Sequence, residues 1–122
     1  MKKELVAFLI ATQCSPDMEE EFTKWYNEVH IPMCLESKLL KRVTHYKLAL
    51  PVEGVTQHKA SYTEGDYPKH LVVYEFKDSK DAIAWWNGPE RLAAKEERQQ
   101  RWKGREFEVN WLAIYEPIMS WH

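Results

Sequence analysis

His30 is the residue of this chain whose type and position are best suited to chemistry. It lies near the end of the segment FTKWYNEVHIP, residues 22–32, in which apolar side chains recur at steps of three and four and predict an amphipathic helix. At about 100° per residue, His30 lies roughly a quarter-turn from the centre of the apolar stripe. This position predicts a side chain at the rim of a pocket.

An imidazole at a pocket rim could act as a general acid or base. Its ordinary pKa of about 6.5 lets it take or give a proton at neutral pH, and an apolar cavity would lower that pKa and favour the neutral base. A second interpretation stays open: His30 could cap the carbonyl groups at the helix end, where the helix dipole favours a cation.

A metal site at His30 is the weaker interpretation. His30 and Cys34 are four residues apart, a spacing that puts two ligands on one helix face, but Pro32 between them disturbs that geometry. Three further histidines lie on predicted strands or in a long loop: His45, His58 and His70. No third ligand follows from spacing, so we predict neither a metal nor another cofactor.

Aromatic residues are candidates for the pocket walls. The chain has six Trp and six Tyr in 122 residues, a surplus that fits a cavity for a flat organic molecule or a dimer surface. The candidates for substrate binding are Tyr26, Tyr74, Trp86 and Trp111. A phenol buried beside His30 could orient a substrate enol or carbonyl, although plain core and dimer packing remains the alternative.

Two helices and four strands would have to position these side chains. Residues 5–12, LVAFLIAT, are almost wholly apolar and predict a strand covered on both faces. The first helix should begin at Ser15-Pro16 and end or kink at Pro32. The remaining strands are predicted over residues 39–50, 70–76 and 107–115.

The second helix should begin at Asp78-Ser79 and kink at Gly88-Pro89. Its predicted inward positions are Ala82, Trp85, Trp86, Pro89 and Ala93. The basic run at residues 95–105 also contains two Glu and two Gln, and is expected on the solvated face of the helix.

The element order β-α-β-β-α-β predicts a single α+β domain over residues 1–122, a ferredoxin-like plait. In this fold two helices cover one face of a four-stranded antiparallel sheet. The first and fourth strands are apolar on both alternating sets, so the second sheet face would be wet in a monomer. We therefore predict a homodimer with the open faces apposed, which closes into an α/β barrel.

Charge and hydropathy exclude other classes. A formal net charge of −2 with interspersed acids and bases offers no field for nucleic acid, and no segment reaches the roughly 20 apolar residues of a membrane span. Cys14 and Cys34 form no disulfide framework, which agrees with a cytoplasmic protein. The stretch from about residue 51 to 68 is predicted as a long loop, either functional or merely mobile, with His58, Tyr62 and Tyr67 available to a site.

The chain combines a βαββαβ order and a doubly apolar first strand with the run Trp25-Tyr26-Asn-Glu-Val-His30-Ile-Pro32. In these features it resembles the dimeric α/β-barrel superfamily, and within it the EthD-like branch. The resemblance implies a cavity between sheet and helices as the usual site. It also implies activities such as cofactor-free oxygenation or decarboxylation of aromatic polyketides, lactone isomerisation and haem degradation.

We therefore predict a protein that binds a small hydrophobic, aromatic or lactone-like molecule. It would be a cofactor-independent enzyme of monooxygenase, decarboxylase or isomerase type, with His30 as general acid or base. A non-catalytic accessory or metabolite-binding protein is the alternative. A haem-degrading enzyme ranks third, because the histidine expected late in the second helix is absent from residues 91–102.

Overall fold

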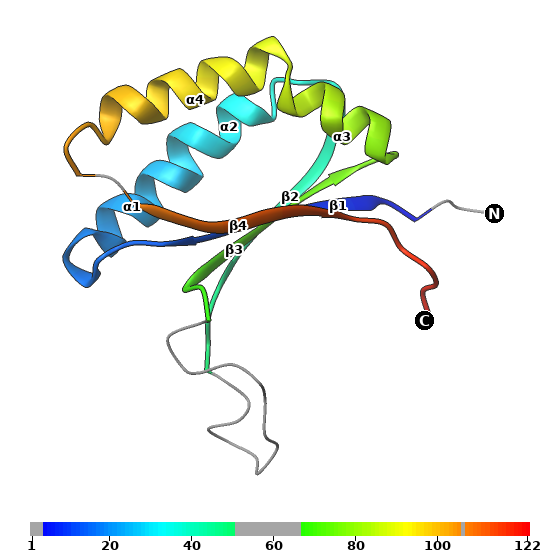
Figure 1. The fold of residues 1–122 in the computed structure, drawn as a ribbon, viewed down its shortest axis with the longest axis horizontal. Helices are drawn as coiled ribbons and strands as arrows, with labels where there is room; N and C mark the ends of the chain where they lie inside the picture. The colour runs from blue at the N-terminus through cyan, green and yellow to red at the C-terminus, as the bar shows by residue number, and fades with distance from the viewer. Residues whose placement is uncertain (1–3, 51–66, 106) are drawn as a thin grey trace.

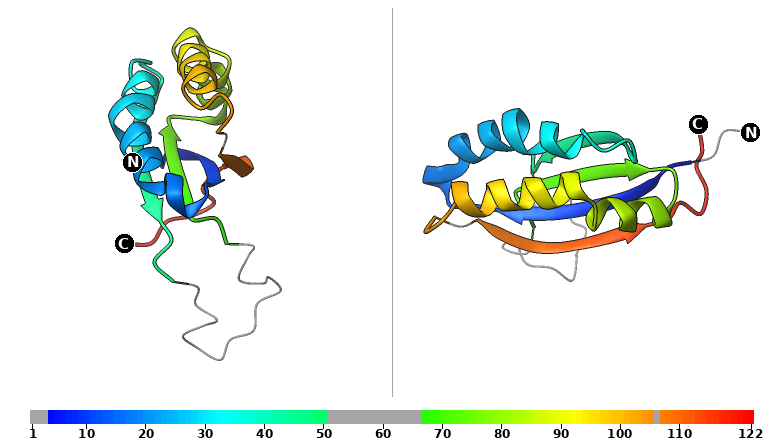
Figure 2. Two further views of the ribbon diagram at one scale, coloured as in Figure 1. Left: turned by 90° about the vertical axis from the view of Figure 1, so that its left-hand side faces the viewer. Right: turned by 90° about the horizontal axis from the view of Figure 1, so that it is seen from above.

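A computed structural model describes residues 4–50, 67–105 and 107–122. The described chain forms one curved sheet with all its helices on the same side (Figure 1). Two views turned by 90° show the helical segments stacked over one sheet face, and no helix of the described residues lies on the opposite face (Figure 2). His58 and Tyr62 of the predicted loop lie outside the described residues.

The sheet has four antiparallel strands in the order β2-β3-β1-β4. Their bounds are Val6–Gln13 for β1, Leu40–Lys47 for β2, His70–Phe76 for β3 and Glu108–Tyr115 for β4. The central strand β1 is the almost wholly apolar one, as expected for a strand covered from both sides. This topology confirms the α+β, ferredoxin-like fold.

The first helical segment is not interrupted at Pro32. It runs through a 3-10 turn η1, α1, a π-helical turn η2 and α2, with bounds Pro16–Met18, Glu19–Trp25, Tyr26–His30 and Ile31–Cys34. Pro32 sits in the first turn of α2, where a missing N–H is tolerated, and the Ile31 N–H bonds the Tyr26 carbonyl five residues back. Of the two predicted effects of Pro32, an end or a kink of the helix, the end was therefore wrong.

The second helical segment is two helices, α3 at Ser79–Trp86 and α4 at Pro89–Arg101. Asp78 caps α3, because its Oδ1 accepts a 2.8 Å hydrogen bond from the Asp81 N–H. A break at Asn87 and Gly88, rather than a kink, separates α3 from α4.

This break resets the phase of the helix, so two predicted inward positions were wrong. Pro89 and Ala93 are exposed, while Ala94 is fully buried. The inward face of α4 therefore differs from the one that a continuous helix would present.

The core lies between the helices and the covered sheet face and is largely aromatic. Its most deeply buried side chains include Phe22, Tyr74, Phe76, Trp85 and Trp102. Ring centroids in this cluster lie 4.8 to 6.3 Å apart, in the range where aromatic pairs add stability beyond burial of area. No helix in the described residues is long and apolar enough to cross a membrane.

Candidate functional site

A pocket opens between the covered sheet face and the helices. Apolar side chains of β1, β4 and α3 form part of its wall, including Ile10, Leu112 and Trp85. Its polar lining comes from the helices, β1 and β3, and includes Thr12, Tyr26, His30, Tyr74, Arg91 and Arg98. The cavity volume is about 40 Å³, enough for a few water-sized groups without movement of the walls.

His30 lines this pocket from the π-helical turn. Its Nδ1 is buried without a hydrogen-bond partner, and its Nε2 lies 3.9 Å from the Cys34 Sγ. Burial lowers the pKa of His30 to about 4, and the nearby Arg98 guanidinium acts in the same direction. His30 is therefore a neutral imidazole at pH 7 that lines a cavity, and its Nδ1 is unpaired.

The helix continues past His30, so this residue does not cap a helix end. Leu35 follows the last helical residue, and its N–H bonds the Ile31 carbonyl at 2.9 Å.

Cys34 is poorly suited to bind a metal. Burial raises the pKa of the Cys34 thiol to about 12, so the sulfur is a protonated thiol rather than a thiolate ligand. No group of three or more candidate metal-binding side chains occurs among the described residues.

Tyr26 and Tyr74 also line the pocket, and their hydroxyl oxygens lie 2.9 Å apart. Burial raises the pKa of both phenols, so both are neutral. One hydroxyl donates to the other, which uses one of their two hydrogens. The second hydrogen has no acceptor in the described part of the chain, so the pair can donate one hydrogen bond to a ligand.

The structure brings together four of the five residues singled out from sequence. Trp86 lines the pocket beside His30, Tyr26 and Tyr74, and its ring stacks on Phe8 with centroids 5.1 Å apart. Trp111 is not part of this lining. It pairs with Ala11 across β1 and β4 and is 41% exposed.

Sequence analysis missed the cationic side of the pocket. Arg91, Lys95 and Arg98 of α4 line it, although Lys95 and Arg98 belong to the run expected on the solvated face. The Arg91 guanidinium lies 3.4 Å from the centroid of the Trp86 ring. The spacing of four and three residues was the available signal, since it puts all three cations on one face of a helix.

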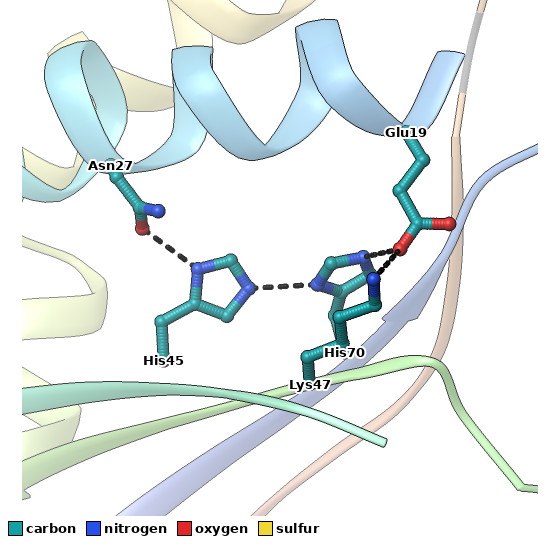
Figure 3. A network of polar contacts seen from close by, with 5 residues as sticks. All are labelled: Glu19, Asn27, His45, Lys47 and His70. Carbon is teal, nitrogen blue, oxygen red and sulfur yellow. Dashed lines mark hydrogen bonds and ion pairs between the residues drawn. The ribbon is translucent and has the colours of Figure 1, made fainter. Parts of the chain in front are cut away.

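A second polar cluster joins the first helical segment to β2 and β3. It comprises Glu19, Asn27, His45, Lys47 and His70, drawn in Figure 3. The His45 Nε2 lies 2.9 Å from the His70 Nδ1, and the His45 Nδ1 lies 2.7 Å from the Asn27 side-chain oxygen. The Glu19 Oε1 lies 3.3 Å from the His70 Nε2 and 3.4 Å from the Lys47 Nζ.

Counting hydrogens assigns the tautomers in this cluster. If the Asn27 oxygen accepts from His45 Nδ1, a neutral His70 must donate from Nδ1 and then turns an Nε2 lone pair toward the Glu19 carboxylate. Turning the Asn27 amide by 180° removes this conflict. Asn27 then donates to His45, and His45 donates to His70. The His70 Nε2–H then points its positive end toward the Glu19 carboxylate, 3.3 Å away, although the geometry of this contact is not that of a hydrogen bond. This second arrangement places no lone pair against the carboxylate while both imidazoles are neutral, in agreement with the lowered pKa values of His45 and His70, each caused mainly by burial.

Residues 5–110 match the family described as a domain of unknown function, DUF4286. The match spans most of the chain, including all four strands up to residue 110 and both helical segments. The chain belongs to the DUF4286 family. No curated protein sequence matches this DUF4286 chain significantly.

Solved structures share the fold of this DUF4286 chain at low sequence identity. An ethyl tert-butyl ether D (EthD) family protein from Bacillus halodurans is 15% identical with a TM-score of 0.61, and the alignment covers 94% of this chain and 100% of that one. A dimeric protein of unknown function and ferredoxin-like fold from Bacteroides fragilis is 13% identical with a TM-score of 0.59, over 94% and 99% of the two chains.

A third structure is a candidate antibiotic biosynthesis monooxygenase from Nitrosomonas europaea, 17% identical with a TM-score of 0.54, over 97% and 94%. These likenesses confirm the EthD-like, ferredoxin-like fold that the sequence resemblance implies for this member of DUF4286.

Proposed function

We propose that the pocket at His30 is the active site of a cofactor-independent enzyme for a small hydrophobic, aromatic or lactone-like substrate. The reaction would be of monooxygenase, decarboxylase or isomerase type, with His30 as general acid or base. One observation carries the proposal. A neutral imidazole with an unpartnered Nδ1 lines the same pocket as a tyrosine pair that has one O–H to spare.

These two groups suit proton transfer next to a carbonyl. A neutral imidazole can accept a proton from an acidic C–H or O–H of a substrate at its unprotonated nitrogen. As that proton leaves, negative charge develops on the substrate oxygen. The free O–H of the Tyr26–Tyr74 pair can stabilise this charge, because a buried donor is worth more there than in water.

The remaining lining fits an aromatic ring or a lactone. Trp85, Trp86 and Leu112 supply apolar surface, and apolar walls with a few placed polar groups are typical of small-molecule sites. A substrate larger than the present cavity requires movement of the half-buried side chains Arg91, Lys95 or Arg98. Relatives in fold described as an EthD family protein and a candidate monooxygenase support this class of chemistry.

We also propose that the protein is a homodimer through the uncovered sheet face. Tyr46, Trp111 and Tyr115 are 52%, 41% and 54% exposed, which leaves large apolar side chains in water. The C-terminal segment adds Ile118 and Trp121, 100% and 83% exposed. Patches of this kind mark interaction surfaces, and one relative in fold is described as dimeric.

A cytoplasmic location is also part of the proposal. Cys14 and Cys34 are free and buried, as expected of thiols in a reducing compartment.

The small cavity favours one other function, a non-catalytic accessory or metabolite-binding role. About 40 Å³ is well below the several hundred Å³ of ordinary ligand pockets, so the cavity could instead be a packing defect or hold a small fragment of a ligand. In this alternative, substitution of His30 would change affinity or stability but no reaction.

Activity profiling separates the two functions. A metabolite extract is incubated with the wild-type protein, with His30→Gln and with His122→Gln, and compounds that appear or disappear are followed by mass spectrometry. His122 is the matched control, since its side chain is 82% exposed. We expect changes with the wild type and the control that slow by about 10²- to 10⁴-fold in His30→Gln. Equal rates in all three would remove His30 from the mechanism, and no change with any of them would favour the accessory role.

A further inference from the structure

The sheet-facing side of α4 is unusually rich in positive charge. Ala94 and Trp102, just past the helix end, are buried at 0% and 2% exposure, which defines the face that packs inward. Arg91, Lys95 and Arg98 share this face, are half-buried and line the pocket. The inward stripe of a helix in a globular protein is normally apolar, so three cations in this place need an explanation.

No carboxylate balances these cations within the described chain. None of the residues that line the pocket is Asp or Glu, and no ion pair within 4.0 Å involves Arg91, Lys95 or Arg98. Glu97 is nearby but is already engaged, at 2.8 Å from both the Arg101 Nε and the Trp25 Nε1. Arg91 lies over the Trp86 ring, but an aromatic face carries no net negative charge. Partly desolvated cations without a carboxylate are costly, so this arrangement favours a ligand that supplies the missing charge.

Unpaired polar atoms lie in the same wall. The Thr12 hydroxyl has no hydrogen-bond partner, and Thr12 is only 1% exposed. The His30 Nδ1 is likewise buried without a partner, and the tyrosine pair has one hydrogen to donate. Buried polar atoms are almost always satisfied, so two orphans that line one pocket indicate a missing hydrogen-bonding partner.

We propose that this pocket binds an organic anion, specifically an aromatic carboxylate whose negative oxygens meet the Arg91, Lys95 and Arg98 side. The Arg91 guanidinium would turn from the Trp86 ring to the carboxylate, and the aromatic body would lie against Trp86 in the place that Arg91 leaves. The Thr12 hydroxyl and the tyrosine pair would donate to the carboxylate or to a carbonyl beside it. Arginine is well suited to this role, because its planar guanidinium matches a carboxylate with two parallel hydrogen bonds. The inference concerns the pocket of the proposed function and rests on it, and it narrows the substrate class.

A pair of probes of equal shape tests the charge preference without any turnover. Benzoate and benzamide differ mainly in charge at pH 7, and both are titrated into ¹⁵N-labelled protein while amide shifts are followed. We expect shifts at Thr12, His30 and Cys34, and a benzoate dissociation constant about tenfold or more below that of benzamide.

Variants assign that preference to the pocket cations. Arg98→Gln and, independently, Arg91→Gln should weaken benzoate about tenfold and leave benzamide nearly unchanged. Lys103→Gln is the matched control, because it removes one positive charge at an exposed position outside the lining. It should bind both probes as the wild type does, which separates local recognition from the overall charge of the protein.

Three outcomes would overturn the inference: the two probes bind equally in the pocket, the amide shifts map elsewhere, or neither probe binds. Equal binding would still leave a small-molecule pocket and hence the proposed function. A benzoate preference in a protein whose His30→Gln variant turns over metabolites at the wild-type rate would do the reverse, since it supports the anion site and contradicts the catalytic role of His30.

Discussion

The hydroxyl oxygens of Tyr26 and Tyr74 lie 2.9 Å apart although 48 residues separate them in the chain. Tyr26 comes from the π-helical turn and Tyr74 from β3, so this contact ties the first helical segment to the centre of the sheet. Both tyrosines line the pocket, where the pair has one hydrogen without an acceptor among the described residues.

Removal of both tyrosine hydroxyls should cost less than the two single removals added together. Tyr26→Phe or Tyr74→Phe leaves the other phenol buried without its partner, which should lower the free energy of unfolding by about 1–3 kcal/mol. The double variant removes both polar groups and should cost clearly less than the sum of the single variants. Urea denaturation of the four proteins checks this, and additive losses would show that the hydroxyls do not interact.

Acid should destabilise the protein through His30. The pKa of His30 is about 4 in the folded protein against about 6.5 in an unfolded chain. Between these values the unfolded state binds the extra proton, so stability is complete above about pH 6.5 and falls as the pH drops toward 4. The loss from this residue should be about 3 kcal/mol, since one pKa unit corresponds to about 1.4 kcal/mol.

The same pH series on His30→Gln isolates that contribution. Burial also lowers the pKa of His45 to about 4, so the variant should still lose some stability in acid, but less than the wild type. Parallel curves of unfolding free energy against pH for the two proteins would contradict the depressed pKa of His30.

Arg98→Gln should raise the pKa of His30. Burial is the main cause of the low value, but the Arg98 guanidinium adds to it, so the pKa should rise from about 4 without reaching 6.5. An NMR titration of the histidine ring signals measures this directly. Lys103→Gln serves as the control for net charge, and an unchanged His30 pKa in Arg98→Gln would place the guanidinium too far away to act.

Glu19→Gln should lower the pKa of His70 further. Burial already depresses it, while the Glu19 carboxylate, 3.3 Å from the His70 Nε2, acts in the opposite direction. Loss of this negative charge leaves burial less opposed. Glu20→Gln is the matched control, since Glu20 is exposed on the same helix. Histidine NMR titrations should show a lower pKa only in Glu19→Gln, and a rise there would contradict the charge interaction between Glu19 and His70.

The fold was predictable because its signals are local or periodic. The almost wholly apolar sequence of β1 predicts a central strand, and β3 has the predicted bounds, residues 70–76. The break before α4 could not be placed from periodicity alone, because Gly88 and Pro89 suit a kink as well as a restart. The restart shifts the inward face of α4 by one residue, so Ala94 is buried and Ala93 is exposed.

The site was predictable only in part, because the apolar pattern shows which way some of its elements face but not all of them. His30, Tyr26, Tyr74 and Trp86 lie on elements whose faces the apolar pattern fixes. The cations of α4 interrupt that pattern, so they resemble a solvated face until the buried Ala94 and Trp102 show which way the helix points. The side of the sheet that Trp111 faces could not be predicted either, because it depends on the register shift between Ala11 and Thr12.

The central claim is that this protein binds small molecules in the pocket at His30. Crystallography with small organic probes tests this claim most directly. Crystals are soaked separately in phenol, benzoate and isopropanol, and the sites shared by the probes are compared. We predict that all three overlap in the pocket, within hydrogen-bonding reach of His30 or the Tyr26–Tyr74 pair. Probes that cluster only elsewhere, with the pocket empty, would contradict the claim.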